Sequence, residues 1–346
     1  MSDARPRSAT IEDVARKAGV SVATVSRALR GLPNVAPSTR LRVQTVADEL
    51  HYRADPSASR LAAGRTRSVA MAVPLLDSWY FSKVMAGAEA VLGDAGYDVL
   101  TFAIDSDERR RRVLGGPLVK RVDGLILVDL RIPDHEVAAL SEVALVSIGF
   151  VVEGASSVMV DDRRLAHGAV THLLDLGHRA IGLVGGLTDD PLRFAVPAQR
   201  QQGYRSAIVD AGLTPRPELE VHGNFSIEGG AEAAAMLLDL AEPPTAIFAM
   251  SDEMAFGVMR EVWARGLQVP GDVSVVGVDD HDFASVVGLT TVQQQVAAHG
   301  AVAARLLLAQ LADPPLEPTP EPTVHLAESA LVVRSSTAPP RHASHR

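Results

Sequence analysis

Cationic and short hydrogen-bonding side chains are concentrated near the amino terminus, in residues 21–39. Arg27 could recognise a base pair, because a guanidinium group can donate two parallel hydrogen bonds to a guanine edge. Val22 and Ala23 could contact thymine methyl groups. The short polar side chains suited to phosphate oxygens are Ser21, Thr24, Ser26, Asn34 and Thr39. The alternative for each of these residues is an exposed side chain with no binding role.

These side chains need a helix to present them, and the local pattern predicts one. Residues 11–18 carry apolar side chains at helical spacing, and Gly19 can end that helix in a left-handed conformation. Ser21 is a candidate N-cap for a second helix over residues 22–29. A third helix is predicted over residues 37–50, with proline at its first position. The order is that of a helix-turn-helix, in which the start of the second helix points at base edges.

Charge is divided unevenly along the 346 residues, whose net charge is −9. Residues 1–67 contain 12 Lys and Arg against 6 Asp and Glu, whereas the remainder contains 21 against 36. A basic end on an acidic body is expected of a local polyanion-binding module. Taken alone, this charge would favour an ordinary solvated basic face, so it supports nucleic-acid binding only together with the helical pattern.

The sequence of this module is specific. The string V-A-x-x-A-G-V-S-x-x-T-V-S-R-x-L, followed by TRLRVQTVADELHY, resembles the headpiece of the LacI/GalR family of bacterial transcription regulators. The resemblance covers the whole module, and the family's layout fits the remaining chain. It implies a DNA-binding headpiece at residues 8–53, a hinge or linker at 54–67, and an effector-binding and dimerisation domain at 68–337. We expect residues 338–346 to form a disordered tail.

The segment between headpiece and body predicts a short helix. Asp55 is a candidate N-cap, Pro56 suits the first helical position, and Gly64 suits the position after the last turn. About eight residues are too few for a stable helix in water, where about 12–15 are usually needed, so it should form only when something packs on it. The resemblance implies a hinge helix, with Leu61 wedged into the minor groove and Ala58 allowing close approach of a second copy.

This segment also departs from the family. The family often has proline two residues after the tyrosine, where this chain has Ala54, and proline follows instead as Pro56. The hinge helix is therefore expected to begin at a different residue. An ordinary flexible linker is the alternative.

From Ser68 the chain alternates apolar strand-like runs with amphipathic helical runs, which predicts parallel sheets with helices on both faces. The unit occurs twice, at about residues 68–160 and 161–290, and a last strand-like run covers residues 330–333. Two similar lobes would leave a cleft between them, a usual place for a small ligand. The expected fold is an all-α helix-turn-helix headpiece joined to a two-lobed α/β domain like that of periplasmic sugar-binding proteins.

Several strings of the body extend the resemblance, namely LLDLGHRAIGLVGG, AIFAMSDEMAFGVM, PGDVSVVGVDD and LTTVQQQ. The residues at positions where the family places effector contacts are Arg200, Ser251, Asp279 and Gln294. Trp79 and Phe225 lie in segments expected at the edge of the cleft, with simple packing as their alternative role. Aromatic faces beside carboxylates and an arginine suit a sugar. Asp252 is expected to cap the helix that begins near Glu253.

Signals of catalysis are weak. The sequence lacks G-x-S-x-G and a P-loop, and the run GLVGG is not a G-x-G-x-x-G fingerprint. His167 and His172 lack a metal-ligand spacing and are expected on a helix surface. The acidic pairs Asp161–Asp162 and Asp279–Asp280 are expected to cap helices or accept hydrogen bonds. We predict no catalytic, metal or cofactor site.

The interpretation that fits these features is a DNA-binding transcription regulator, a repressor that binds a palindromic operator as a homodimer under the control of a sugar-like effector. The absence of cysteine and of an apolar run near the about 20 residues that span a bilayer makes a cytoplasmic location the expectation. One alternative is a sugar-binding protein of periplasmic type, which would need a signal peptide and no headpiece. The other is an α/β enzyme acting on a small metabolite, with an accessory DNA-binding domain.

Overall fold

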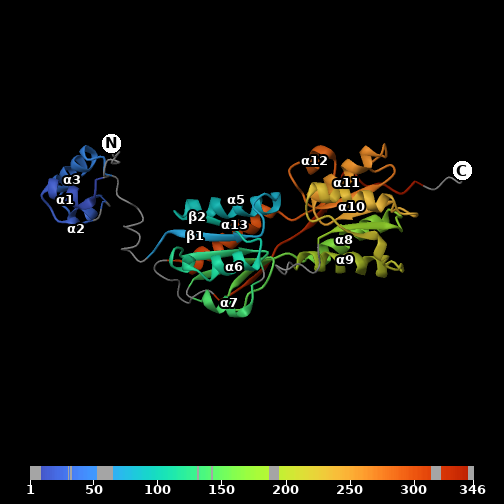
Figure 1. Ribbon diagram of the computed structural model, residues 1–346, viewed down its shortest axis with the longest axis horizontal. Helices are drawn as coiled ribbons and strands as arrows, with labels where there is room; N and C mark the ends of the chain where they lie inside the picture. The colour runs from blue at the N-terminus through green and yellow to red at the C-terminus, as the bar shows by residue number, and fades with distance from the viewer. Residues whose placement is uncertain are drawn as a thin grey trace, which may run out of the picture. The chain divides into compact units, whose positions relative to one another are not determined.

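A computed structural model describes residues 9–52, 65–186, 195–312 and 321–341, except Arg30, Leu32, Arg131 and Glu142. The chain divides into two compact units, residues 1–67 and residues 68–346 (Figure 1). The predicted hinge helix lies outside the described residues, and with it Ala54, Asp55, Pro56, Ala58, Leu61 and Gly64.

The described residues of the first unit form the helices α1 (Ile11–Ala18), α2 (Val22–Leu29) and α3 (Pro37–Glu49). A capping box begins α1, in which Thr10 accepts a hydrogen bond from the Asp13 backbone N–H at 3.3 Å and Asp13 accepts one from the Thr10 backbone N–H at 3.1 Å. Gly19 ends α1 with φ +66°, which confirms the predicted left-handed cap. The three helices bury a common apolar core, formed by Val14, Ala15, Ala18, Val25, Ala28, Val43, Val46 and Ala47.

The first lobe of the second unit is built on a six-stranded sheet in the order β11-β5-β4-β3-β1-β2, and every pair in it is parallel. Its strands are β1 (Ser68–Val73), β2 (Asp98–Ala103), β3 (Gly124–Val128), β4 (Ala144–Ile148), β5 (Ser156–Met159) and β11 (Val324–Leu326). Its helices are α5 (Trp79–Asp94), α6 (Asp107–Leu114), α7 (Asp134–Ala139), α13 (Val296–Gln310) and the 3-10 turn η1 (Pro117–Lys120).

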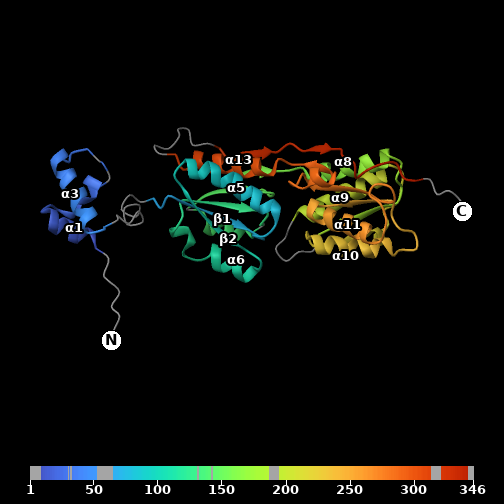
Figure 2. The ribbon, with the colours of Figure 1, turned by 90° about the horizontal axis from the view of Figure 1, so that it is seen from above.

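Alternation along β1 builds a core on each face of this sheet. Val69, Met71 and Val73 pack toward α5 and α13, whereas Ala70 and Ala72 pack toward α6 and α7. Figure 2 shows α5 and α13 on one side of the strands and α6 on the other.

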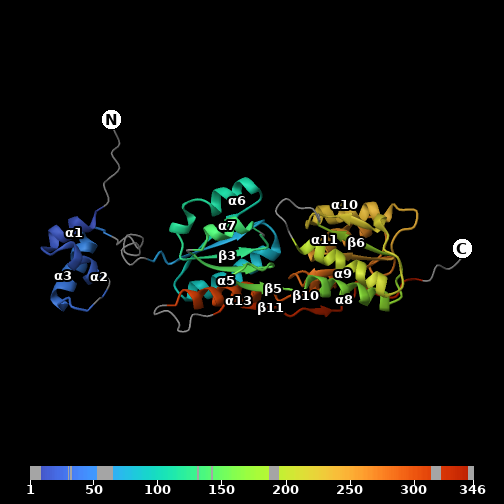
Figure 3. The ribbon, with the colours of Figure 1, turned by 90° about the horizontal axis from the view of Figure 1, so that it is seen from below.

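The second lobe repeats this plan in the strand order β12-β10-β9-β8-β6-β7, with β12 antiparallel to β10. Its strands are β6 (Ile181–Gly185), β7 (Glu220–His222), β8 (Ala246–Ala249), β9 (Ser274–Asp279), β10 (Thr290–Gln293) and β12 (Ala330–Val332). Its helices are α8 (Asp162–Asp175), α9 (Val196–Asp210), α10 (Ile227–Leu238), α11 (Asp252–Ala264), α12 (Ala284–Val287) and the turn η2 (Pro217–Leu219). The pairs α8–α9 and α10–α11 cover opposite faces of the sheet (Figure 3).

The lobes are not the two contiguous halves that the sequence predicts. The chain passes from the first lobe to the second after β5, returns after β10 to form α13 and β11 in the first lobe, and passes back before β12. Three connections therefore join the lobes.

Glycines allow α13 to lie close to α5, because a Cβ on Gly87 would overlap the Ala297 carbonyl oxygen.

The prediction of a disordered tail is wrong for residues 338–341, which contact the second lobe. The Ala338 carbonyl oxygen lies 2.9 Å from His178 Nε2 and accepts a hydrogen bond from Ser274 Oγ at 3.0 Å. Arg341 pairs with Asp272 at 2.8 Å. The second lobe supplies the partners of this segment. Residues 342–346 lie outside the described residues.

Candidate DNA-reading helix and ligand cleft

Helix α2 carries the predicted base-contact residues on its exposed side. Ser21 Oγ accepts a hydrogen bond from the Thr24 backbone N–H at 3.1 Å, which confirms Ser21 as the predicted cap. The helix buries Val25 and Ala28, which fixes its orientation in the three-helix unit. Val22, Ala23 and Arg27 are exposed as a result. Of the predicted phosphate contacts, Ser21 and Asn34 are exposed, and the half-buried ones are Thr24, Ser26 and Thr39.

The second unit contains a cleft between its lobes, with about 700 Å³ of space free of protein atoms, part of it open to solvent. The first lobe lines it with Leu75, Ser78, Tyr80, Phe81, Asp129, Ile148 and Gly149. The second lobe and the connections line it with Val160, Asp162, Val196, Arg200, Phe225, Ser251, Glu253, Asp279 and Gln294. The structure thus brings together five of the six predicted effector residues. Trp79 is not among the lining residues.

Arg200 is held by the second lobe's own groups. Its side chain is buried, and Nε donates to Asp162 Oδ1 at 2.7 Å. Nη1 donates to the Met250 carbonyl oxygen. Asp162 is the first residue of α8, whereas its neighbour Asp161 caps that helix by accepting from the Arg164 backbone N–H at 2.9 Å. The acidic pair therefore divides between a cap and a buried ion pair.

Asp279 and Asp129 are the two other buried aspartates of the cleft. Asp279 ends β9 with φ +123° and accepts a hydrogen bond from Gln294 Nε2 at 2.6 Å. Burial raises the pKa of Asp279 to about 7, against the lowering effect of Arg200. Burial, with the charge of Asp162 adding to it, raises the pKa of Asp129 to about 7 as well.

Four further residues line the cleft that were not predicted there, namely Tyr80, Asp129, Asp162 and Glu253. A signal existed for Asp129, because it directly follows the buried run of β3, and ligands bind at the carboxyl ends of parallel strands. Glu253 gave no comparable signal. It reaches the cleft as the second residue of α11, where its carboxylate accepts a hydrogen bond from Ser78 Oγ of the first lobe at 3.2 Å.

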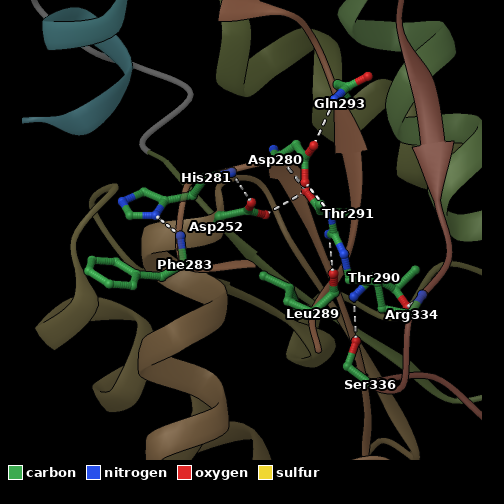
Figure 4. Close-up of polar contacts among 10 residues, drawn as sticks. All are labelled: Asp252, Asp280, His281, Phe283, Leu289, Thr290, Thr291, Gln293, Arg334 and Ser336. Atoms are coloured by element: carbon green, nitrogen blue, oxygen red, sulfur yellow. Dashed lines mark hydrogen bonds and ion pairs between the residues drawn. The ribbon is translucent and has the colours of Figure 1, made fainter. Parts of the chain in front are cut away.

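Asp252 does not cap α11 as predicted. Ser251 does, because its hydroxyl accepts a hydrogen bond from the Met254 backbone N–H at 3.3 Å. Asp252 is fully buried and accepts from Thr291 Oγ1 at 2.6 Å and from the His281 backbone N–H at 2.8 Å (Figure 4). Its role is structural, but it joins β10 to the loop after β9 and does not close a helix end.

A second set of hydrogen bonds lies beside those of Asp252 and involves Asp280 and Ser336. Asp280 accepts from Gln293 Nε2 at 2.7 Å and pairs with Arg334 at 2.6 Å, and Ser336 accepts from the Thr290 backbone N–H at 2.7 Å (Figure 4). These bonds hold the ends of β9 and β10 and the segment after β12 together, which fixes Asp279 and Gln294 in the cleft.

Trp79 lies in a contact between the lobes, beside the cleft. Its indole Nε1 donates to Asp282 at 3.2 Å, and its ring lies 4.6 Å from that of His281. Lys83, one turn further along α5, pairs with Asp282 at 2.8 Å. The structure thus places Trp79 in the packing role that was the alternative for it, whereas Phe225 lines the cleft.

The predicted surface histidines lie half-buried on α8. His167 contacts Asp210 at 3.0 Å, and His172 contacts the Thr337 hydroxyl at 3.0 Å. Within the described ranges, no three His, Asp or Glu side chains are arranged to hold a metal ion. No helix in the described part of the chain is long and apolar enough to cross a membrane.

Comparison with known proteins agrees with this division into units. The sequence profile described as "Bacterial regulatory proteins, lacI family" matches residues 10–55, and that of a periplasmic binding protein-like domain matches residues 170–337. Catabolite control protein A of Priestia megaterium is 35% identical over 305 residues, which cover 86% of this chain and 91% of that protein.

The chain belongs to the lacI family. Solved structures of this family have the same architecture as the present member. A lac repressor dimer bound to operator and the anti-inducer ONPF is similar with a TM-score of 0.81 and 27% identity, over 96% of this chain and all of that one. A complex of the transcriptional regulator CelR with cellobiose is similar with a TM-score of 0.69 and 32% identity, over the same shares. This lacI-family chain is therefore related to DNA-binding transcription regulators, and its relatives are not enzymes.

Proposed function

We propose that this protein is a repressor that binds a palindromic operator as a homodimer and responds to a sugar-like effector in the cleft. The observation that carries the proposal is the pairing of two units with different chemistry. One presents Arg27 on the exposed face of a capped helix, and the other surrounds a cleft with Arg200, Asp279 and Gln294. We also propose that it acts in the cytoplasm, where the DNA is, and that it catalyses no reaction.

The DNA side of the proposal assigns base readout to Val22, Ala23 and Arg27. Their exposure on α2 supports it, because a recognition helix must leave its outer face free for the major groove. Phosphate contacts are assigned to Ser21, Thr24, Ser26, Asn34 and Thr39. The lac repressor whose structure is similar was seen as a dimer on its operator, and two-fold symmetry of the protein calls for a palindromic site.

The effector side assigns ligand contacts to Arg200, Phe225, Ser251, Asp279 and Gln294. The similar regulator CelR was seen with cellobiose, which supports a sugar as the class of ligand. Trp79 is proposed to act on the arrangement of the lobes, because its partners His281 and Asp282 belong to the second lobe.

The two sites would communicate through the segment 54–67. We propose that Leu61 wedges into the minor groove and that Ala58 allows the two hinge copies to approach each other. A ligand can change this equilibrium only if it binds one arrangement of the lobes more tightly than the other. Each lobe has its own sheet, so we propose that the three connections between the lobes take up such a change.

The proposal can be tested by selecting sites for the full-length protein from a pool of random double-stranded DNA. We expect a palindromic consensus, bound as two copies of the chain per duplex in sedimentation. Adding sugars should then change the affinity for that consensus. Selection of no sequence, or of a site bound by one copy, would count against the proposed function.

A further inference from the structure

The charge of the cleft indicates which ligands it can take. Its described lining contains four carboxylates, those of Asp129, Asp162, Glu253 and Asp279, and a single cation, Arg200. Arg200 is already paired with Asp162 and bonded to the Met250 carbonyl oxygen. A buried charge needs a partner of opposite sign or a hydrogen bond. Among the described lining residues there are therefore several acceptors for a ligand, and the one cation is already paired with Asp162.

Helix termini could also attract an anion, because their N–H groups carry partial positive charge. Here α5 and α11 begin at the cleft, and the protein's own groups occupy those ends. Glu253 accepts a hydrogen bond from Ser78 Oγ, and Ser78 is the N-cap residue of α5. Ser251 caps α11, whose first turn contains Asp252 and Glu253. An anionic ligand would meet carboxylates at both helix ends.

Asp129 is the least satisfied of these groups. Asp129 is 8% exposed, and within the described part of the chain no group donates a hydrogen bond to its carboxylate. It has φ +48°, a left-handed conformation that costs energy for a residue with a side chain. Gly149 leaves room for it, since a Cβ there would overlap Asp129 Oδ1. Asp129 thus combines a strained backbone conformation with a carboxylate that has no described hydrogen-bond donor, at the wall of the cleft.

We propose that the effector bears no negative charge, that it is a neutral or amine-bearing sugar and not a phosphorylated or acidic one, and that Asp129 accepts a hydrogen bond from it. This inference rests on the proposed function and deepens its effector site. Asp129 belongs to the first lobe, and Asp279 belongs to the second. A ligand that donates a hydroxyl or ammonium hydrogen to each holds the lobes together.

The first test is a thermal-shift series on the full-length protein at pH 8. The probes are D-glucose, D-glucosamine, glucose 6-phosphate and glucuronate, with ribose, ribose 5-phosphate and cellobiose. We expect a neutral or amino sugar to raise the unfolding midpoint and the phosphorylated and acidic forms to leave it unchanged. A larger shift from a phosphate or an acid overturns the inference, and so does a series without any shift.

The second test uses two variants at Asp129. Asp129→Ala should weaken binding of the stabilising sugar by about tenfold or more in calorimetry, because hydrogen bonds to charged groups are the strong ones. Asp129→Asn keeps an acceptor and should recover binding of a neutral sugar more than of an amino sugar. Wild-type affinity in Asp129→Ala overturns the role of this residue.

The ligand-free protein gives an independent readout. Asp129→Asn should raise its unfolding midpoint at pH 8 by about 3 °C or more, because an unpaired buried carboxylate is removed. Glu232→Gln, an exposed change in α10, is the matched control and should leave the midpoint unchanged. A fall in the midpoint of Asp129→Asn would show that the carboxylate has a structural partner. If a palindromic operator is selected but the ligand is an anion, only this inference fails. If no operator is selected at all, the proposed function fails.

Discussion

At the scale of single residues, Arg27 is the side chain of α2 with the most to contribute to base recognition. It is exposed, and a bidentate contact with guanine discriminates by about 1–3 kcal/mol against the wrong base. We expect Arg27→Ala to lower affinity for the selected operator by about tenfold or more and affinity for random DNA much less. Fluorescence anisotropy with both duplexes at one salt concentration measures the ratio.

Arg16 provides the control for charge alone. It is exposed on α1, where it pairs with Asp13 at 3.1 Å. Arg16→Ala should weaken binding to both duplexes by a similar factor, since it removes only positive charge. If Arg27→Ala also lowered both affinities equally, Arg27 would be a phosphate contact and the base assignment would be wrong.

The buried aspartates of the cleft give a pH dependence with a definite sign. The pKa of Asp129 and that of Asp279 are about 7 in the folded protein, above the ordinary value of 3.8. Between about pH 4 and pH 7 the folded state therefore binds more protons than the unfolded state, and stability falls as pH rises. Above that window the contribution is constant. We expect the ligand-free protein to gain stability when Asp129→Asn removes one of these groups, and to gain more at pH 8 than at pH 5.

The comparison must be made between variants at each pH. Burial lowers the pKa of His178 and of His299, so these groups favour the folded state as pH rises. The groups facing Asp129 are Tyr80 of α5, Asp162 of α8 and Asp279 of β9, with Arg200 of α9. Denaturant unfolding at pH 5 and pH 8 measures the difference. An equal gain at both pH values would mean that Asp129 does not titrate in this range.

Cleft residues were predictable where their positions could be matched to those of the family. Ser251, Asp279 and Gln294 lie in strings shared with the family, and Arg200 was matched by its position. The structure places all four at the cleft. Asp129 lies outside these strings, whereas Glu253 lies inside AIFAMSDEMAFGVM, a string that does not reveal its role. Their importance arises from three-dimensional placement, since Glu253 meets Ser78, which is 175 residues away in the chain. No local pattern reports a contact of that kind.

At the scale of elements, the close approach of α13 to α5 is a feature that a single methyl group can test. A Cβ on Gly300 would overlap the Val84 carbonyl oxygen, which is backbone and cannot move aside. We expect Gly300→Ala to destabilise the protein by about 1–3 kcal/mol, the usual cost of overpacking a core. Gly168 of α8 has open space around its added Cβ, so Gly168→Ala should stabilise by about 0.5–1 kcal/mol through helix propensity. Denaturant unfolding compares the two, and equal effects would contradict the packing described.

Elements were predictable where apolar periodicity was strong. Strands such as β1 and β3, with five consecutive buried residues each, agree with the predicted runs. Helix α6 was missed because it buries only Arg110 and Leu114 and therefore has no apolar stripe. Arg110 is held by Glu136 at 2.9 Å, a contact that lies 26 residues away in the chain. The position of α13 in the first lobe was not predicted either, because a sequence pattern does not show which lobe a helix packs against.

At the scale of the whole molecule, the lobe contact beside the cleft should influence effector binding. Trp79 and Lys83 of the first lobe share Asp282 of the second, and His281 lies against the Trp79 ring. The exposed Lys83–Asp282 pair is worth little for overall stability, as surface ion pairs are. The pair joins the two lobes and can therefore still change effector affinity, because apparent affinity scales with the fraction of molecules whose lobes are in the binding arrangement.

We therefore expect Asp282→Asn to weaken binding of the stabilising sugar by about two- to fivefold while the unfolding midpoint changes by no more than about 1 °C. The matched control is Asp239→Asn, which removes an exposed pair with Arg265 that lies entirely within the second lobe. That variant should bind the sugar as the wild type does. Calorimetry and thermal unfolding on the same samples give both quantities. Equal loss of affinity in the two variants would mean that the effect is general electrostatics, whereas loss in Asp282→Asn alone would show that this contact selects the lobe arrangement to which the ligand binds.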